Sequence, residues 1–166
     1  MLNLPKLDRI DIKILAELQK NGRISNTQLA AIVGLSPSPC LSRVKRLEDA
    51  GYISGYSAKI NFAKLGGIQI VFNAVTLGDH RLSDFMRFEQ GIREYEELVE
   101  CHLVSGGFDY LLKFVVPGIQ HYQAMMEEIL KKNIGISKYF SYIVIKSPVT
   151  KMQPSVRMHM SAEEPQ

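Results

Sequence analysis

The sequence predicts an α+β protein made of two small domains. Three short segments with helical spacing of apolar residues occupy the first 50 residues, and strand-like and helix-like segments alternate from residue 68 onward. Charge divides at the same place, because residues 1–61 carry nine Lys and Arg against five acids, whereas the rest of the chain carries 11 against 12. A basic first domain followed by a nearly neutral second domain favours a polyanionic partner for the first domain.

The composition indicates a globular chain. Of the 166 residues, 46% are hydrophobic and 22% are charged, close to the average for globular proteins. No apolar run reaches the roughly 18 residues that a membrane span needs, and residues 1–9 lack the apolar stretch of a signal peptide. We therefore expect a cytoplasmic protein with no membrane partner. Cys40 and Cys101 fall in different predicted domains, so we expect both to be reduced and buried.

The first domain, residues 1–61, begins with two capped helices. Asp8 and Asp11 have the spacing of a helix start, and the helical pattern ends at an Asn-Gly pair. Ser25 and Gln28 form the pattern of a capping box, and the short apolar segment after them stops at Gly34. Both helices are therefore predicted from their ends as well as from their periodicity.

A third helix and a β-prone segment complete this domain. Ser36 can cap the helix, and Pro37 suits its first position because the missing N–H costs nothing there. The helix is expected to run to about Ala50, and its tight connection to the preceding helix is the layout of a helix-turn-helix. Residues 52–60 are β-prone and are predicted as a wing, and residues 62–67 end in two glycines and are predicted as a linker.

In the second domain, residues 68–148, segments with the two-residue period of a strand alternate with segments that have the 3.6-residue period of a helix. The patterns predict a strand at 68–77, a helix at 82–97, strands at 99–105 and 108–116, a helix at 119–132 and a strand at 139–146. This βαββαβ order is the ferredoxin-like arrangement. Residues 149–166 show no periodicity and are predicted as a loose C-terminal tail.

The predicted sheet has two apolar faces. In the strand at 108–116, Leu111 and Val115 point to one side, and four aromatic and aliphatic side chains point to the other: Phe108, Tyr110, Leu112 and Phe114. One face is expected to pack on the helices. Because the other face would be exposed in a monomer, we predict that a homodimer buries it.

The third helix separates into an apolar and a polar side. Its apolar side is expected to hold Cys40, Leu41, Val44 and Leu47. Its opposite side offers hydroxyls and cations: Ser38, Ser42, Lys45 and Arg46, with Arg43 on the flank. In a helix-turn-helix this helix enters the major groove, so the serines are candidate base readers and the cations candidate phosphate contacts. Any surface helix also shows Lys and Arg to solvent, and these residues taken singly favour that simpler interpretation.

The sequence resembles the Lrp/AsnC family of transcriptional regulators. The resemblance is carried by the segments LDRIDIKILAELQKNGRIS, LSPSPCLSRVKRLEDAGYI, VSGGFDYLLKFVVP and YFSYIVIKS. It implies a winged helix-turn-helix that binds double-stranded operator DNA and a ferredoxin-like domain that binds a small effector. It also implies dimers joined through the sheets, and octamers or other assemblies of dimers.

The resemblance further implies an effector pocket at the turn between the second and third strands of the sheet. Here the residues concerned are Gly106, Gly107, Phe108, Asp109 and Tyr110, with Ser141 and Tyr142 on the last strand. Glycines let a ligand approach the backbone, and Asp109 could receive an ammonium group, so we expect the effector to be an amino acid. A plain hairpin turn, in which the glycines serve geometry alone, is the alternative.

Two other functions fit the sequence less well. An enzyme would need converging catalytic groups, but the four histidines fall in unrelated places, and adjacent Cys101 and His102 point to opposite faces of a strand. No metal-ligand spacing and no glycine-rich nucleotide loop is present, so we expect no enzyme, no metal and no cofactor. Binding of single-stranded RNA on sheet aromatics is the weaker rival, because those strands lack interleaved basic residues.

Overall fold

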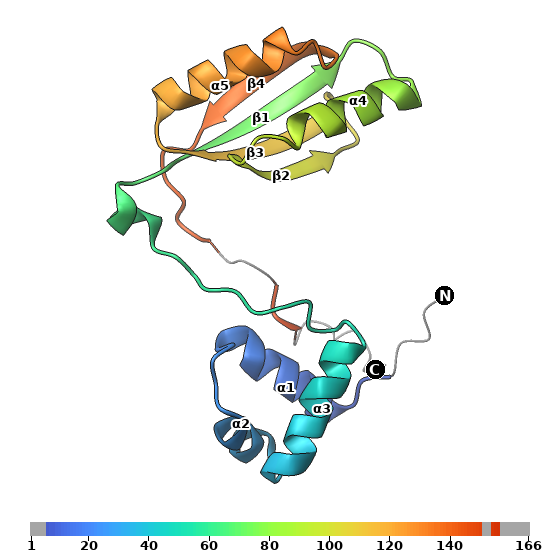
Figure 1. Ribbon diagram of the computed structural model, residues 1–166, viewed down its shortest axis with the longest axis vertical. Helices are drawn as coiled ribbons and strands as arrows, with labels where there is room; N and C mark the ends of the chain where they lie inside the picture. Colours follow the sequence, from blue (N-terminus) through green and yellow to red (C-terminus); the bar gives the residue numbers. More distant parts are fainter. Residues whose placement is uncertain (1–5, 151–153, 157–166) are drawn as a thin grey trace. The chain divides into compact units, whose positions relative to one another are not determined.

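A computed structural model describes residues 6–150 and 154–156, which form two compact units. The first unit contains the N-terminal residues up to Lys59 and the described residues from Thr150 onward, and the second runs from Ile60 to Val149. Figure 1 shows the helices of the first unit and the sheet of the second. Each unit has its own apolar core.

Three helices build the first unit: α1 (Arg9–Lys20), α2 (Asn26–Val33) and α3 (Pro37–Asp49). Both predicted capping boxes form, since the Asp8 carboxylate accepts from the Asp11 N–H at 2.8 Å and the Ser25 hydroxyl accepts from the Gln28 N–H at 3.3 Å. Gly34 ends α2 with φ +79°, a left-handed conformation that glycine adopts without strain.

Two local predictions for this unit are wrong. Ser36 makes no side-chain cap on α3; instead the Asn26 side-chain amide donates to the Pro37 carbonyl at 2.7 Å and joins the starts of α2 and α3. Residues 52–60, predicted as a β-prone wing, also form no strand. Tyr52 and Ile53 instead bond through their N–H groups to the Leu47 carbonyl and pack against the helices.

The second unit has the predicted βαββαβ order after a short 3₁₀ helix at Phe62–Leu65, within the segment expected to be a linker. Its elements are β1 (Gln69–Leu77), α4 (Leu82–Ile92), β2 (Leu98–Leu103), β3 (Tyr110–Val116), α5 (Ile119–Lys131) and β4 (Ile136–Ile143). The strands form an antiparallel sheet in the order β2-β3-β1-β4, with both helices over one face (Figure 1). The ferredoxin-like prediction is confirmed.

Several element bounds differ from the prediction by one to three residues, and that of α4 differs by five. Helix α4 stops five residues early because the chain turns at Tyr95, whose N–H bonds to Ile92 O and whose carbonyl accepts from Leu98 N–H. Strand β4 begins three residues early, directly after Gly135, so that it pairs along β1 from Leu77 to Val71. A turn sets the end of α4 and pairing with β1 sets the start of β4, and the local pattern carries little information about either.

The described part of the predicted tail contacts α1. The side-chain amide of Gln19 donates to the Pro154 carbonyl at 2.8 Å, and its oxygen accepts from the Val156 N–H at 3.2 Å. Val156 also packs against the core of the first unit. These residues therefore differ from the loose tail that we expected; residues 151–153 and 157–166 of that tail lie outside the described residues.

Candidate DNA-binding surface and effector pocket

The exposed side of α3 carries most of the residues that the sequence assigns to DNA. Ser38, Ser42 and Lys45 are exposed, whereas Cys40 and Leu47 are fully buried against α1 and α2. Leu41 differs from the prediction, because 45% of it is exposed and it lies at the border of the polar side. In the described part of the chain Lys45 has no ion-pair partner, so its charge is available to a ligand.

Two arginines of α3 are bound by acids at the start of α1. The guanidinium of Arg43 donates to Asp8 at 2.6 Å and to Asp11 at 2.9 Å, and that of Arg46 donates to Asp11 at 2.6 Å. The Asp11 side chain is 1% exposed. The backbone N–H of Asp11 holds the pKa of Asp8 below its usual value, and Arg43 lowers it further.

These ion pairs distinguish the two arginines. Arg43 bonds both acids through one nitrogen and its side chain is 29% exposed, whereas Arg46 makes one such bond and is 46% exposed. An arginine has five N–H donors, so Arg46 can stay bound to Asp11 and still present donors to a phosphate. Sequence reasoning missed the contribution of Asp11, although its place at the third helical position already predicted a cap.

The turn between β2 and β3 is held to the rest of the sheet by Asp109. Its carboxylate accepts from the Leu77 N–H at 2.7 Å and lies 3.0 Å from His80 Nε2, and its N–H donates to Val75 O. Gly106 has φ +146°, a conformation that a side chain would strain. Gly107 is exposed and Phe108 is half-buried. Asp109 therefore already has a structural function at the end of β1.

Tyr110 lies in the core and not on the surface of the turn. It is 1% exposed, packs 4.5 Å from the Phe88 ring centroid, and donates its hydroxyl to Glu89 of α4 at 2.7 Å. Burial, followed by the hydrogen bond to Glu89, raises the pKa of Tyr110 far above its usual value. The phenol is therefore neutral at physiological pH.

Ser141 and Tyr142 point to opposite faces of the sheet. Ser141 pairs with Asn73, faces the helices and lies 2.6 Å from the Tyr122 hydroxyl. Tyr142 pairs with Phe72 on the open face and is 58% exposed. Strand β4 is two strands away from β3, so within one chain neither residue lies beside the 106–110 turn.

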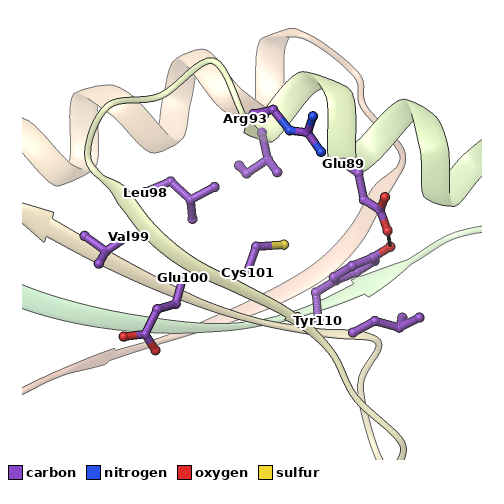
Figure 2. A pocket seen from close by; sticks show the side chains of 9 residues that line it. Glu89, Arg93, Leu98, Val99, Glu100, Cys101 and Tyr110 are labelled. Carbon is purple, nitrogen blue, oxygen red and sulfur yellow. Dashed lines mark hydrogen bonds between the residues drawn. The ribbon is translucent and has the colours of Figure 1, made fainter. Parts of the chain in front are cut away.

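A pocket that sequence reasoning missed lies between α4 and β2 (Figure 2). Its volume is ≈ 400 Å³, and its lining combines charged, apolar and thiol side chains: Glu89, Ile92, Arg93, Leu98, Val99, Glu100, Cys101, Leu103 and Tyr110. Cys101 is exposed, which contradicts the expectation that both cysteines are buried. Partial desolvation of its thiol still raises the pKa of that group. The only feature of the sequence that could have indicated this pocket was the pair Glu89 and Arg93, four residues apart on one helix.

The described residues give no sign of a metal centre. Among residues 6–150 and 154–156, no three His, Cys, Asp or Glu side chains gather in a way that could hold a metal ion. In the same ranges no helix combines the length and hydropathy needed to cross a membrane. Cys101 pairs with Leu112 on the helix side of the sheet and His102 with Leu111 on the open side, so the two do point apart as expected.

Comparison with known proteins agrees with both units. Residues 7–54 match a family model of a winged helix-turn-helix DNA-binding domain, and residues 70–154 match the Lrp/AsnC ligand binding domain. The leucine-responsive regulatory proteins of Escherichia coli and Klebsiella pneumoniae are 47% identical over 140 residues, which is 84% of this chain and 85% of theirs.

Solved structures show the same likeness. A transcriptional regulator from Neisseria meningitidis, crystallised as an L-Met complex, has a TM-score of 0.85 and 31% identity over 93% of this chain and 99% of its own. An AsnC family regulator from Agrobacterium tumefaciens has a TM-score of 0.85 and 30% identity over 92% and 99% of the two chains. With two domain models matched in order and relatives that align along most of the chain, the protein belongs to the Lrp/AsnC family and is a DNA-binding transcriptional regulator with a ligand-binding second domain.

Proposed function

We propose that the protein binds double-stranded operator DNA through α3 and that an amino acid bound to its second unit changes this binding. The observation that carries the proposal is the exposed polar side of α3, where Ser38 and Ser42 lie beside cations. Hydroxyls near the start of the helix can reach base edges, and cations further along can reach phosphates. No catalytic step is needed, and the protein would act in the cytoplasm beside its DNA.

Lys45 and Arg46 are the phosphate contacts in this proposal. Lys45 is exposed, and Arg46 keeps donors available beyond its bond to Asp11. In this proposal Arg43 acts within the protein, because its bonds to Asp8 and Asp11 fix α3 against the start of α1. The helix therefore presents a rigid surface to the groove, and little ordering entropy is lost on binding.

A homodimer would place two copies of α3 on the DNA. The open face of the sheet supports it: Phe140 and Tyr142 of β4 are 52% and 58% exposed, and Phe72 lies beside them. Dimers of a helix-turn-helix protein read half-sites about 34 to 36 Å apart, so we expect imperfectly palindromic operators. Further assembly into octamers or similar groups of dimers would let longer DNA wrap around the protein.

The effector would be an amino acid. The regulator from Neisseria meningitidis was crystallised with L-Met, and the Escherichia coli relative is named for its response to leucine. An effector changes DNA binding only by the difference in its affinity for the DNA-binding and other states of the protein. The proposal therefore predicts reciprocal coupling: operator DNA must change the affinity for the amino acid by the same factor.

Fluorescence anisotropy titrations at several salt concentrations test the DNA proposal. Each phosphate contact contributes about one unit to the slope of log K against log salt, so Lys45→Ala and Arg46→Ala should each flatten that slope by about one. Lys20→Ala removes an exposed cation of α1 that pairs with Glu17, and should leave the slope unchanged. Equal slopes for all four proteins, or stronger binding to single-stranded RNA than to duplex DNA, would contradict the proposal.

A further inference from the structure

Asn26 of α2 connects the starts of the two helices of the helix-turn-helix. Its side-chain Nδ2 donates to the Pro37 carbonyl at 2.7 Å, although the two residues are 11 positions apart in the chain. Pro37 is the first residue of α3, and Ser36 before it makes no side-chain cap. The first turn of α3 is therefore attached to α2 by a side chain of α2, and is not held by a cap of its own.

This hydrogen bond orients the peptide group that leads into Ser38. A carbonyl oxygen and the N–H that follows it lie in one rigid plane, so fixing the Pro37 oxygen also fixes the direction in which Ser38 continues the chain. Ser38 is exposed and is the first candidate base reader of α3. Because the first N–H groups of a helix have no acceptor within the helix, its first turn frays most easily, and an external bond restrains it most.

Helix α3 has a second anchor near its middle, where Arg43 donates to Asp11 of α1 at 2.9 Å. The candidate base readers, Ser38 and Ser42, lie in sequence between this anchor and the bond from Asn26. A helix held at one point can pivot, whereas anchors on two other helices fix its angle as well. A hydroxyl reads a base only within hydrogen-bond distance of the base edge, so the angle of α3 decides which bases the serines reach.

The oxygen of the Asn26 amide argues that this residue does more than stabilise the fold. Its Oδ1 is buried and accepts no hydrogen bond from any described residue, which is unfavourable for a carbonyl oxygen. Turning the amide over would place this oxygen against the Pro37 carbonyl, which is another acceptor. An apolar side chain of similar size would avoid the buried acceptor, so what asparagine adds here is the donor to α3.

We propose that Asn26 is a positioning residue for sequence recognition, which sets where Ser38 and Ser42 lie in the major groove. It acts through α3 and needs no contact with a base. The inference rests on the proposed function, because it requires that α3 reads the groove. Lys45 and Arg46 lie further along α3, beyond the first turn. Loss of the Asn26 bond should therefore reduce discrimination between sequences and leave non-specific binding intact.

Fluorescence anisotropy with two duplexes tests this role: one that the wild type selects from a random pool, and a scrambled duplex of the same length and composition. Asn26→Leu removes the donor at similar size and should lower the ratio of the two affinities at least about tenfold, as expected for one lost base contact. Asn26→Ala removes the same donor without adding apolar bulk and should give the same loss. In both variants the affinity for the scrambled duplex and its salt slope should match the wild type.

Ser25→Ala separates positioning from stability. It removes the hydroxyl that caps α2 and keeps the Asn26 donor, so it should lower the melting temperature and retain the affinity ratio. If Ser25→Ala loses the ratio as Asn26→Leu does, at an equal fall in melting temperature, the effect belongs to the stability of α2, and the positioning role is overturned.

Ser38→Ala shows through which residue Asn26 acts. It should lower the affinity ratio by itself, and Asn26→Leu should cost less in this background than alone, because the contact to be positioned is already absent. Fully additive losses would overturn the role.

The outcomes also separate this inference from the proposed function. A ratio that survives both Asn26→Leu and Asn26→Ala overturns the inference, while the wild-type ratio still supports the proposed function. If the wild type binds both duplexes equally, base reading by α3 fails, and the positioning role fails with it.

Discussion

Asp11 is a buried carboxylate that joins two helices. It accepts from Arg43, from Arg46 and from the backbone N–H of Asp8, and it is fully buried. Three charge-assisted hydrogen bonds satisfy its lone pairs, which is what makes burial of the charge tolerable. The same side chain caps α1 and aligns the cations of α3.

We expect Asp11→Asn to lower the free energy of unfolding of the first unit by about 1–3 kcal/mol, because Arg46 loses its charged partner and Arg43 loses one of its two. Urea denaturation followed by circular dichroism measures this. Asp49→Asn changes an exposed acid at the end of α3 and should cost less than about 0.5 kcal/mol. Similar losses in the two variants would show that Asp11 does not link the helices.

Tyr110 makes the stability of the second unit sensitive to alkaline pH. Burial and the bond to Glu89 raise its pKa in the folded protein above its value in the unfolded chain, which is about 10. Its stabilising contribution is therefore complete below about pH 10 and is lost as pH rises further. Tyr110→Phe should reduce the fall in melting temperature between about pH 9 and 11, whereas Tyr139→Phe should retain it. An unchanged fall in Tyr110→Phe would assign the effect to other groups.

The β2–β3 turn depends on one side chain for its connection to β1. Asp109 accepts from the N–H of Leu77, the last residue of β1, and contacts His80 beyond it. We expect Asp109→Ala to lower the free energy of unfolding of the second unit by about 1–2 kcal/mol, because a half-buried N–H loses its acceptor. Asp109→Asn keeps an acceptor oxygen and should cost less, as urea denaturation would show.

The same pair of variants tests the effector role that the sequence suggests for Asp109. If the carboxylate binds an ammonium group, both variants lose the response of DNA binding to the amino acid. If it is structural, Asp109→Asn keeps the response and only Asp109→Ala weakens it. An Asp109→Asn protein that is stable but unresponsive would place the effector at the turn.

The open face of the sheet is the apolar surface expected to join two chains. Its apolar part lies over β1 and β4, whereas Glu100 and Lys113 pair at 2.6 Å toward β2. Phe140→Asp should shift the mass measured by light scattering toward the monomer, since a charge would be buried without a partner. Leu82→Asp alters an exposed leucine of α4 outside this face and should leave the mass unchanged. A dimeric Phe140→Asp protein would exclude this interface.

Residues 154–156 contact α1 within the first unit. Gln19 uses both ends of its amide in this contact. We expect Gln19→Ala to lower the stability of the first unit by about 0.5–1.5 kcal/mol and to raise hydrogen exchange in α1. Gln123→Ala, on the exposed side of α5, serves as the control. Unchanged exchange in Gln19→Ala would show that the contact adds nothing to stability.

The shared exposure of the candidate DNA-binding residues could be predicted because these residues sit at fixed helical spacing. Ser38, Ser42 and Lys45 share one side of α3 whatever surrounds the helix. The ion pairs of Asp11 join residues more than 30 positions apart, and no local pattern records them. The effector residues were less predictable for the same reason, since Ser141 and Tyr142 are neighbours in sequence but face opposite sides of the sheet.

The order of helices and strands, the division into two domains and the polar side of α3 were determined by the sequence alone, because periodicity and end residues act over a few positions. Tertiary structure decided the rest: which acids the arginines of α3 pair with, that Tyr110 is buried, that residues 52–60 form no strand, and that a pocket opens between α4 and β2. The physical reason is that pairing, burial and cavities depend on residues distant in the chain, whose contacts exist only after the helices and strands have packed.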